Sequence, residues 1–542
     1  MLADAVASAV LRRYASLPKH GKPQPGEYTL LAGFAVTDDA VPDAPPRVVA
    51  LGTGTKCLPA SSRCPRGEAL SDSHAEVIAR RAFVRFLYDE LERATSDDGD
   101  GETKRDATDA NASTRSVPIV EWIATTTTTT TPFRLRGGVR VHLYATQSPC
   151  GDASIFELAD ARESASVAPA DGETADAGRA ANKRAKTSSG GSGSGAGSFF
   201  LGATGAKVFE SCEVSVQGSQ GSREALRVDA ERGVAGQRLG ACRLKPGRGA
   251  QTDCMSCSDK IARWVALGVQ GALPSSLISR RSDHLESSHA SHGTDVGTFE
   301  TFETYGAVRL ASVVVASPSS SEYREDFFRE NDDFGRSTRR AVLDALRRAL
   351  VDRVGFCVPT RDAPGVFVAA PAPPELSSSA GQARGWVASG TSLNWYWREN
   401  RESAPVRKKN GDGGEASGAE VTLGGTGRKA GFPKKARGSR KAQSRLCRAS
   451  LAARYAEVMA CIRARLLRET NRRSAIEGRR DAAKNDENET SISYETLKRF
   501  RAGAYAERDA AFRAPPSLFA RWSAKDPEVG RTFEVTAPSG SF

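Results

Sequence analysis

The stretch Ser73-His74-Ala75-Glu76 opens the segment on which the fold of this 542-residue chain depends. Over residues 74–93 the apolar residues recur with the spacing of one helix face, at Val77, Ile78, Val84, Leu87 and Leu91. Segments typical of strands stand on both sides of this helix, at 29–36, 47–51, 139–146 and 310–316, and the first two are expected to form a hairpin. Further helices are expected over 1–17, 258–267 and 337–351. Because strands alternate with helices, the sequence predicts an α/β fold with helices packed on a sheet.

Five segments are too polar or too low in complexity to bury apolar surface, and they interrupt this pattern. They are 96–115, 163–198, 279–301, 401–440 and 474–490. We interpret them as disordered insertions, so that residues 1–542 form one large domain enlarged by linkers.

The net charge of +12 and the pI near 9.3 favour a polyanionic partner, either a nucleic acid or a phosphorylated ligand. Much of the excess is local, because Lys and Arg crowd residues 407–448, and such a run is also typical of a solvated segment. No apolar run approaches the roughly 20 residues of a membrane span, so no membrane association is expected.

The ten cysteines form no compact framework, and no secretory segment precedes them, which indicates a reducing intracellular compartment. The cluster Lys434-Lys435-Ala436-Arg437 is compatible with a nuclear signal or with a solvated linker, so both nucleus and cytoplasm are expected locations. The sequence gives no indication of the oligomeric state.

Two later cysteine signatures complete the opening motif: Ser148-Pro149-Cys150-Gly151-Asp152 and Met255-Ser256-Cys257-Ser258-Asp259-Lys260. One imidazole from His74 and two thiolates from Cys150 and Cys257 can hold a zinc ion and leave its fourth position open for water. We expect each ligand at or near the N-terminus of a helix, where the helix dipole favours a thiolate. Glu76 could then move protons around that water. This is the set of groups that hydrolytic nucleobase deaminases use.

The other cysteines suggest weaker alternatives. Cys254 and Cys257 form a Cys-x-x-Cys that could be a structural zinc knuckle or a redox pair, but no second cysteine pair stands at finger spacing. Cys57 and Cys64 lack a histidine at a suitable spacing, so we interpret them as free thiols.

Taken together, these residues resemble the eukaryotic adenosine deaminases that act on RNA, a family that includes the ADAR editing enzymes and the tRNA-specific deaminases acting at position 37 of alanine tRNA. The resemblance rests on Gly52-Thr53-Gly54-Thr55-Lys56-Cys57, on the three motifs around His74, Cys150 and Cys257, and on Gly268-Val269-Gln270-Gly271. The tRNA branch looks closer, because His74 leaves no room before it for the double-stranded-RNA-binding domains of the ADAR enzymes, and Leu17-Pro18-Lys19-His20-Gly21-Lys22-Pro23 resembles the start of the tRNA enzymes.

The resemblance implies an editase domain with a cytidine-deaminase-like mixed sheet. It implies zinc on His74, Cys150 and Cys257, with Glu76 as the proton shuttle that converts adenosine to inosine and releases ammonia. Thr55 and Lys56 would line the mouth of the pocket, and tRNA would be the partner. Since the base must leave its stack to reach the metal, adenosines in loops are the expected substrates.

The family also buries inositol hexakisphosphate beneath the active site, and a lining rich in Lys and Arg could neutralise it there. The positions that match its ligands are Arg80, Arg81, Lys260, Arg263, Trp264, Gln270, Arg448, Tyr494, Lys498, Tyr505, Trp522 and Lys525. Judged by residue type alone, these residues would be interpreted as ordinary surface cations and salt-bridge partners. The resemblance to the family favours their interpretation as ligands of the phosphate groups. The spacing between Lys498 and Tyr505 departs from the family pattern by one residue, so Lys498 and Arg499 compete for one role.

Two other functions stay open on the sequence. One is ADAR-type editing of double-stranded or messenger RNA. The other is a non-catalytic RNA-binding scaffold that uses residues 407–448. The scaffold is disfavoured because an inactive protein has no chemical reason to keep all three ligands and Glu76.

Overall fold

The computed structural model describes residues 2–96, 117–123, 131–156, 207–208, 239–245, 252–279, 307–318, 333–398, 418–476, 489–522 and 533–538. A sheet of eight strands forms its centre, in the order β13-β12-β8-β2-β3-β15-β16-β17. These strands are β2 (Leu31–Asp38), β3 (Arg47–Thr53), β8 (Val139–Ala145), β12 (Leu310–Ala316), β13 (Gly365–Ala369), β15 (Thr391–Tyr396), β16 (Ala419–Leu423) and β17 (Arg428–Lys429). Strands β13, β12 and β8 are parallel, and the others pair antiparallel, so the sheet is mixed.

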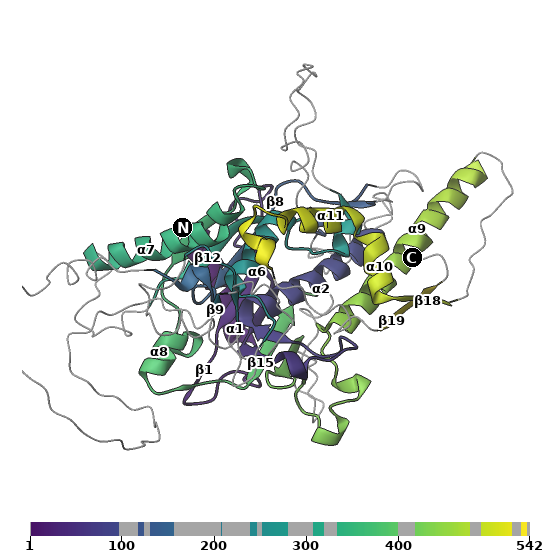
Figure 1. Cartoon of the computed structure of the whole chain (residues 1–542). Helices are drawn as coiled ribbons and strands as arrows, with labels where there is room; N and C mark the ends of the chain where they lie inside the picture. The colour runs from purple at the N-terminus through teal and green to yellow at the C-terminus, as the bar shows by residue number, and fades with distance from the viewer. Residues whose placement is uncertain are drawn as a thin grey trace, which may run out of the picture.

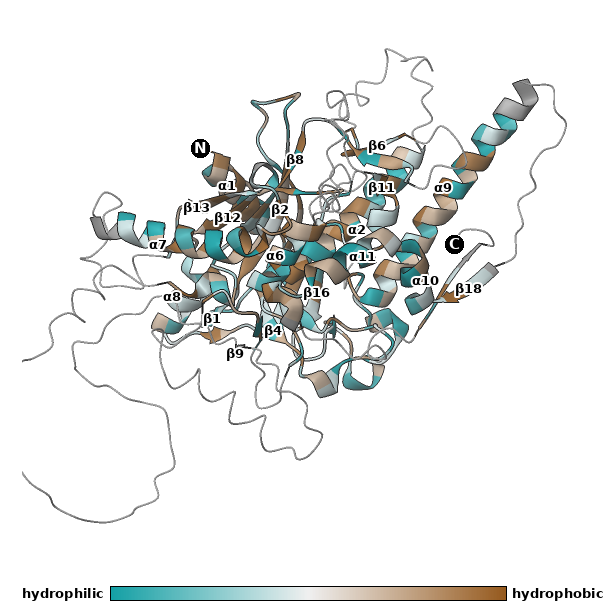
Figure 2. Cartoon of the chain, turned by 45° about the horizontal axis from the view of Figure 1, so that its top comes forward, coloured by the Kyte–Doolittle hydropathy of each residue, from teal (hydrophilic) through white to brown (hydrophobic). Residues whose placement is uncertain are grey.

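Helices cover both faces of this sheet. On β2, Gly33 leaves room for Val10 of α1 (Leu2–Ser16), whereas the next residue, Phe34, stacks on Phe83 of α2 (Ala75–Ser96). Since successive side chains of a strand point to opposite faces, α1 and α2 lie on opposite sides of the sheet. Figure 2 shows the apolar residues concentrated on β2, β12 and β13, and the outer surface of α7 (Asp333–Leu350) hydrophilic.

The C-terminal part of the chain closes over the α2 side. Helix α9 (Arg448–Ile476) packs along α2, and α11 (Gly503–Phe512) contacts α6 (Cys257–Leu267), as Figure 1 shows. Between them stand α10 (Tyr494–Arg501) and the hairpin of β18 (Glu489–Ser493) and β19 (Glu534–Pro538). The remaining short elements are α8 (Ser378–Ala383), β1 (Glu27–Tyr28), β4 (Thr55–Cys57), β5 (Asp72–His74), β6 (Val120–Trp122), β7 (Phe133–Leu135), β9 (Lys207–Val208), β10 (Arg243–Leu244), β11 (Ile278–Ser279) and β14 (Val387–Ala388).

The predicted α/β class, the hairpin of β2 and β3, and the expected helices are confirmed. The start of the second helix differs, because His74 ends β5 and α2 begins one residue later. The prediction of a disordered insertion at 401–440 is wrong for its second half, where β16 and β17 complete the sheet and Val421 is buried. The other four expected insertions lie, apart from a few end residues, outside the described part of the chain. None of the helices described is both long enough and apolar enough to cross a bilayer.

Gly52 allows α2 to lie directly on β3. A Cβ at this position would be 2.5 Å from Ile78 Cγ2 and 2.6 Å from the backbone nitrogen of Ala79. We therefore expect Gly52→Ala to force the helix away from the strand and to lower the free energy of unfolding by about 1–3 kcal/mol. Gly390→Ala is the control, because a Cβ there meets no atom of the described chain within 4 Å. Urea denaturation checks this, and equal midpoints for the two variants would contradict it.

Candidate metal centre and active site

Three residues that are far apart in the sequence meet at one end of the sheet. His74 ends β5, Cys150 lies in the loop after β8, and Cys257 begins α6. His74 Nδ1 lies 3.9 Å from Cys150 Sγ and 3.7 Å from Cys257 Sγ. A tetrahedral zinc ion, with bonds of about 2.0 Å to nitrogen and 2.3 Å to sulfur, would hold its ligand atoms about 3.6 Å apart. The structure therefore brings the three expected ligands together with a spacing that fits such an ion.

Local structure fixes both cysteines. Ser256 caps α6 by accepting a hydrogen bond from the Asp259 backbone N–H, which places Cys257 at the helix N-terminus. The Cys257 backbone N–H donates to Cys150 Sγ over 3.3 Å. Gly151 has a φ of +107°, and a Cβ there would lie 2.3 Å from Ser256 Oγ, so only glycine fits between the two cysteine segments.

The prediction that a helix begins directly after Cys150 is wrong. Only a 3₁₀ turn, Asp152–Ser154, follows, and the chain is extended again at Ile155. The Asp152 carboxylate accepts hydrogen bonds from Arg348 and from the Gly240 backbone N–H, which ties the turn to neighbouring segments. Cys150 is therefore stabilised by the N–H group of Cys257 and by nearby charges, without a helix of its own.

The two thiols differ in proton affinity. A hydrogen bond from Cys257 holds the pKa of Cys150 well below its ordinary value, and the charges of Lys245 and His74 add to this effect. Burial raises the pKa of Cys257, and the hydrogen bond with Cys150 raises it further. Lys245 Nζ lies 3.1 Å from Cys257 Sγ, where it can stabilise a thiolate.

Glu76 lies in the first turn of α2, and only 4% of its surface is exposed. Burial raises the pKa of its carboxyl group, and the negative charge of Cys150 raises it further. Within the described part of the chain, Glu76 Oε2 and the neighbouring Thr55 Oγ1 are buried without a hydrogen-bond partner. Such atoms cost about 1–3 kcal/mol each, so they mark the place where a water or a ligand is to be bound.

Thr55 and Lys56, which the resemblance placed at the mouth of the pocket, lie on β4 next to the candidate ligand His74. Thr55 is the β-sheet partner of His74, since β4 and β5 are paired antiparallel. Lys56 Nζ donates to the carbonyl oxygen of Ala388, so the lysine is held against the end of β14.

The sequence did not reveal the role of Lys245, whose side chain is completely buried. Its ammonium donates to both oxygens of Asp72, over 3.0 and 2.7 Å, and Lys260 binds the same carboxylate. Although burial opposes ionisation, these two lysines hold the pKa of Asp72 well below its usual value. The contact between Asp72 and a lysine 173 residues away depends on the fold. The one available signal was the position of Lys245 just before the third ligand motif.

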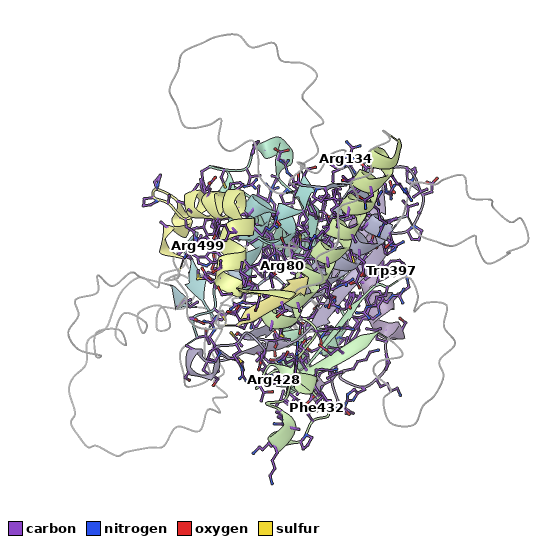
Figure 3. All side chains as sticks on the ribbon, turned by 90° about the vertical axis from the view of Figure 1, so that its right-hand side faces the viewer. Arg80, Arg134, Trp397, Arg428, Phe432 and Arg499 are labelled. Carbon is purple, nitrogen blue, oxygen red and sulfur yellow. The ribbon has the colours of Figure 1, made fainter. Side chains whose placement is uncertain are left out.

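Beneath this centre is a cavity of about 560 Å³. Of the twelve positions expected to bind a polyphosphate, eleven line it, and Lys525 lies outside the described residues. The eleven are Arg80, Arg81, Lys260, Arg263, Trp264, Gln270, Arg448, Tyr494, Lys498, Tyr505 and Trp522. Arg499 lines the cavity together with Lys498, so the two residues do not exclude each other. Arg80 lies on α2 and Arg499 on α10, and both are labelled in Figure 3.

The lining of the cavity is strongly basic, and the sequence missed Arg63 and Arg513 as members of it. Nine of its residues are Lys or Arg, against Asp72, Glu495 and Asp509. Burial lowers the pKa of Arg81 to about 10, and the positive charge of Arg448 contributes to this shift. Cations gathered in a partly desolvated space repel one another unless an anion lies between them. The arrangement therefore suits a compact, highly charged anion.

Lys260 connects the two sites, because it lines the cavity and also binds Asp72. From Asp72 the contacts continue to Lys245 and then to Cys257. A continuous chain of charged groups thus joins the cavity to the candidate metal centre.

Comparison with known proteins gives matches that include the site. Residues 50–281 match the family model described as the adenosine-deaminase (editase) domain, and this range contains His74, Glu76, Cys150 and Cys257. The chain is 36% identical over 275 residues to "tRNA-specific adenosine deaminase 1" of Drosophila melanogaster, covering 51% of this chain and 52% of that protein. The human protein of the same name is 30% identical over 336 residues, covering 50% and 62%. "Double-stranded RNA-specific editase Adar" of Drosophila melanogaster is 29% identical over 278 residues, covering 51% and 31%. The chain thus aligns with between half and two thirds of the tRNA-specific relatives.

Asp72 provides a test of the buried charge cluster. Asp72→Asn leaves Lys245 and Lys260 without their shared carboxylate, and we expect this to lower the free energy of unfolding by about 3–5 kcal/mol. Asp39→Asn is the control, because Asp39 and Arg140 form a pair on the surface with side chains 52% and 58% exposed, and it should cost less than about 1 kcal/mol. Chemical denaturation of both variants is the measurement. A cost for Asp72→Asn no larger than that of the control would show that the cluster is not needed for stability.

Proposed function

We propose that this chain, which carries an adenosine-deaminase (editase) domain, is a zinc-dependent hydrolase that converts adenosine to inosine in tRNA and releases ammonia. The proposal rests on one observation. The potential ligand atoms of His74, Cys150 and Cys257 lie within 4.8 Å of one another, and the buried carboxylate of Glu76 follows His74 by two residues. One imidazole and two thiols match the donor set of a catalytic zinc site, which keeps one position for water.

A zinc ion bound by these ligands would supply an activated water as the nucleophile for C6 of adenine. Glu76 would accept one proton from the water and deliver it to N1 of the base. It would then carry a second proton, from the hydroxyl group added at C6, to the amino group, which leaves as ammonia. The raised pKa of Glu76 suits this role, since a shuttle must both accept and release protons near neutral pH. Thr55 Oγ1 orients the nucleotide beside the site, and Lys245 holds the thiolate of Cys257. Because Glu76 is buried, the base enters only after it has left its stack, which favours adenosines in loops.

The proposed fold is cytidine-deaminase-like, with α2 and α6 bringing Glu76 and Cys257 together beside a mixed sheet. We further propose one domain over residues 1–542. This is supported by β16 and β17, which extend the same sheet as β2 although they lie almost 400 residues later in the chain.

Adenosine 37 of alanine tRNA is the proposed substrate. The two tRNA-specific relatives are 36% and 30% identical to this chain, against 29% for the Adar editase, which makes editing of duplex RNA the second candidate. No disulfide joins the nine described cysteines, as suits a reducing compartment, and we propose the nucleus or the cytoplasm as the location.

The basic cavity is proposed to hold inositol hexakisphosphate. Its cations surround a space of about 560 Å³, and Arg263 lies 5.6 Å from the rings of both Tyr505 and Trp522, which fix its position. When the anion is bound, its negative charge would attract Lys260. Because Lys260 and Lys245 share the carboxylate of Asp72, the position of Lys245 would depend on the anion as well.

Glu76→Gln tests the mechanism. We expect it to lower deamination of an alanine tRNA transcript by roughly 10²- to 10⁴-fold, because the amide cannot carry the proton, while the zinc content stays unchanged. Glu121→Gln is the control, because Glu121 of β6 forms an exposed ion pair with Arg134 of β7. Inosine is measured by nuclease digestion and mass spectrometry, and zinc by elemental analysis. Inosine formation by Glu76→Gln at the rate of the control would disprove the assigned role.

The substrate is tested by comparing that transcript with a long RNA duplex, each with and without a zinc chelator. Chelator-sensitive inosine at position 37 alone is expected. Inosine in the duplex alone would replace the tRNA assignment with the editing one. Folded, zinc-loaded protein that makes inosine in neither RNA would favour the scaffold.

The cavity ligand is tested without activity. Protein purified under mild conditions should release an inositol polyphosphate on acid denaturation, detected by anion-exchange chromatography. The double variant Arg81→Met/Arg448→Met should release less, whereas Arg340→Met, on an arginine whose side chain is 84% exposed, should release as much as the wild type. Folded wild-type protein that releases no phosphate would contradict the proposal.

A further inference from the structure

A short basic segment follows the last antiparallel pairing of the central sheet. Residues 428–441, here called the basic loop, contain seven Lys or Arg residues and no Asp or Glu. Lys434, Lys435, Arg440 and Lys441 are exposed. Figure 3 shows that the ribbon beyond Arg428 and Phe432 projects from the body of the molecule. This concentration of one sign of charge on a projection is not needed for packing.

Both ends of the basic loop are held by specific contacts. At its start, Arg428 pairs with Glu68 over 3.0 Å, and β17 pairs with β16. Just after its end, Ser444 Oγ donates to the buried carboxylate of Glu420 over 2.5 Å, and Arg445 donates to Asn394 over 2.8 Å. Two 3₁₀ turns, Lys434–Ala436 and Arg440–Ala442, lie between these ends, and Ala442 is buried. The loop thus has a defined place on the fold, unlike a solvated linker.

That place is beside the candidate active site. Gly424 lies so close to Lys56 that a Cβ on the glycine would be 2.7 Å from Lys56 Cγ. The Gly427 carbonyl oxygen accepts from the Leu70 backbone N–H over 2.9 Å, two residues before Asp72. Lys56 follows Thr55, the sheet partner of the metal ligand His74. The segment that leads into the basic loop therefore packs against Lys56 and Leu70, next to the strands that carry Thr55 and His74.

We propose that the basic loop binds the phosphate backbone of the RNA whose adenosine enters the pocket. The inference rests on the proposed function, and it adds the surface that positions the RNA. Exposed Lys and Arg side chains bind phosphates by charge and carry no information about base sequence. A loop that starts next to the candidate active site is placed to bind backbone phosphates that flank the extruded base, so it would add affinity without contacting the base itself. The cations of this loop are distinct from those that line the anion cavity, because none of the residues 428–441 belongs to that lining.

The test compares two double variants of equal charge change. Lys434→Glu/Lys435→Glu reverses two cations of the basic loop, and Arg336→Glu/Arg340→Glu reverses two exposed cations on α7. Binding of the alanine tRNA transcript is measured by fluorescence anisotropy over a series of salt concentrations, using full-length protein. We expect the loop variant to bind about tenfold more weakly and to lose roughly one to two units of the slope of log K against log salt concentration. The α7 variant should keep both values within about twofold of the wild type.

Lys434→Gln/Lys435→Gln separates loss of attraction from added repulsion, and we expect about half of the change in slope. Thermal melting establishes that all variants are folded. Loop variants that bind tRNA with the affinity and the salt dependence of the α7 control would overturn the proposal. The binding result is measured separately from catalysis: wild-type protein that binds RNA through the loop but makes no inosine would refute the proposed function, while the basic loop would still be an RNA-binding surface.

Discussion

The rest of the site depends on the ion pairs that the buried carboxylate of Asp72 forms with Lys245 and Lys260. Two ammonium groups share it, and both lysines lie in segments that the fold brings from far along the sequence. A buried charge is tolerated only with a partner, so the position of each member fixes the others. One lysine touches Cys257 and the other lines the basic cavity. The geometry of the candidate metal centre is therefore coupled to the electrostatic state of the cavity below it.

The central sheet and the elements next to it hold the candidate ligands in place. β5 presents His74, the loop after β8 presents Cys150, and α6 presents Cys257, so each ligand comes from a different part of the chain. Gly52 lets α2 approach β3 closely, which brings Glu76 and His74 to the same end of the sheet. The helices α10 and α11 then close the cavity from the C-terminal side. Rigid packing in these layers keeps the ligand atoms at a spacing that a tetrahedral ion requires.

Sequence patterns predicted the parts of this structure that depend on local periodicity or on motif order. The strand at 310–316 has the predicted bounds, because a run of Val and Ala buried on both faces has one stable arrangement. The three candidate ligands, which the structure brings together, could be named from the sequence because their residue types are chemically distinctive. Lys245 was missed because its partner lies 173 residues away, and no local pattern encodes that contact. β16 was missed because the glycines and lysines around residues 419–423 mask a strand whose burial depends on β15.

The pairing of β3 with β15 has a consequence for synthesis. Leu51 of β3 lies opposite Trp395, so these neighbours in the sheet are separated by more than 300 residues of chain. While the protein is still being translated, one edge of β3 has no strand to pair with until residues 391–396 leave the ribosome. An unpaired strand edge is a template for association with other chains. The nascent polypeptide therefore exposes this edge for a long interval, and the sheet closes only after most of the chain has been made.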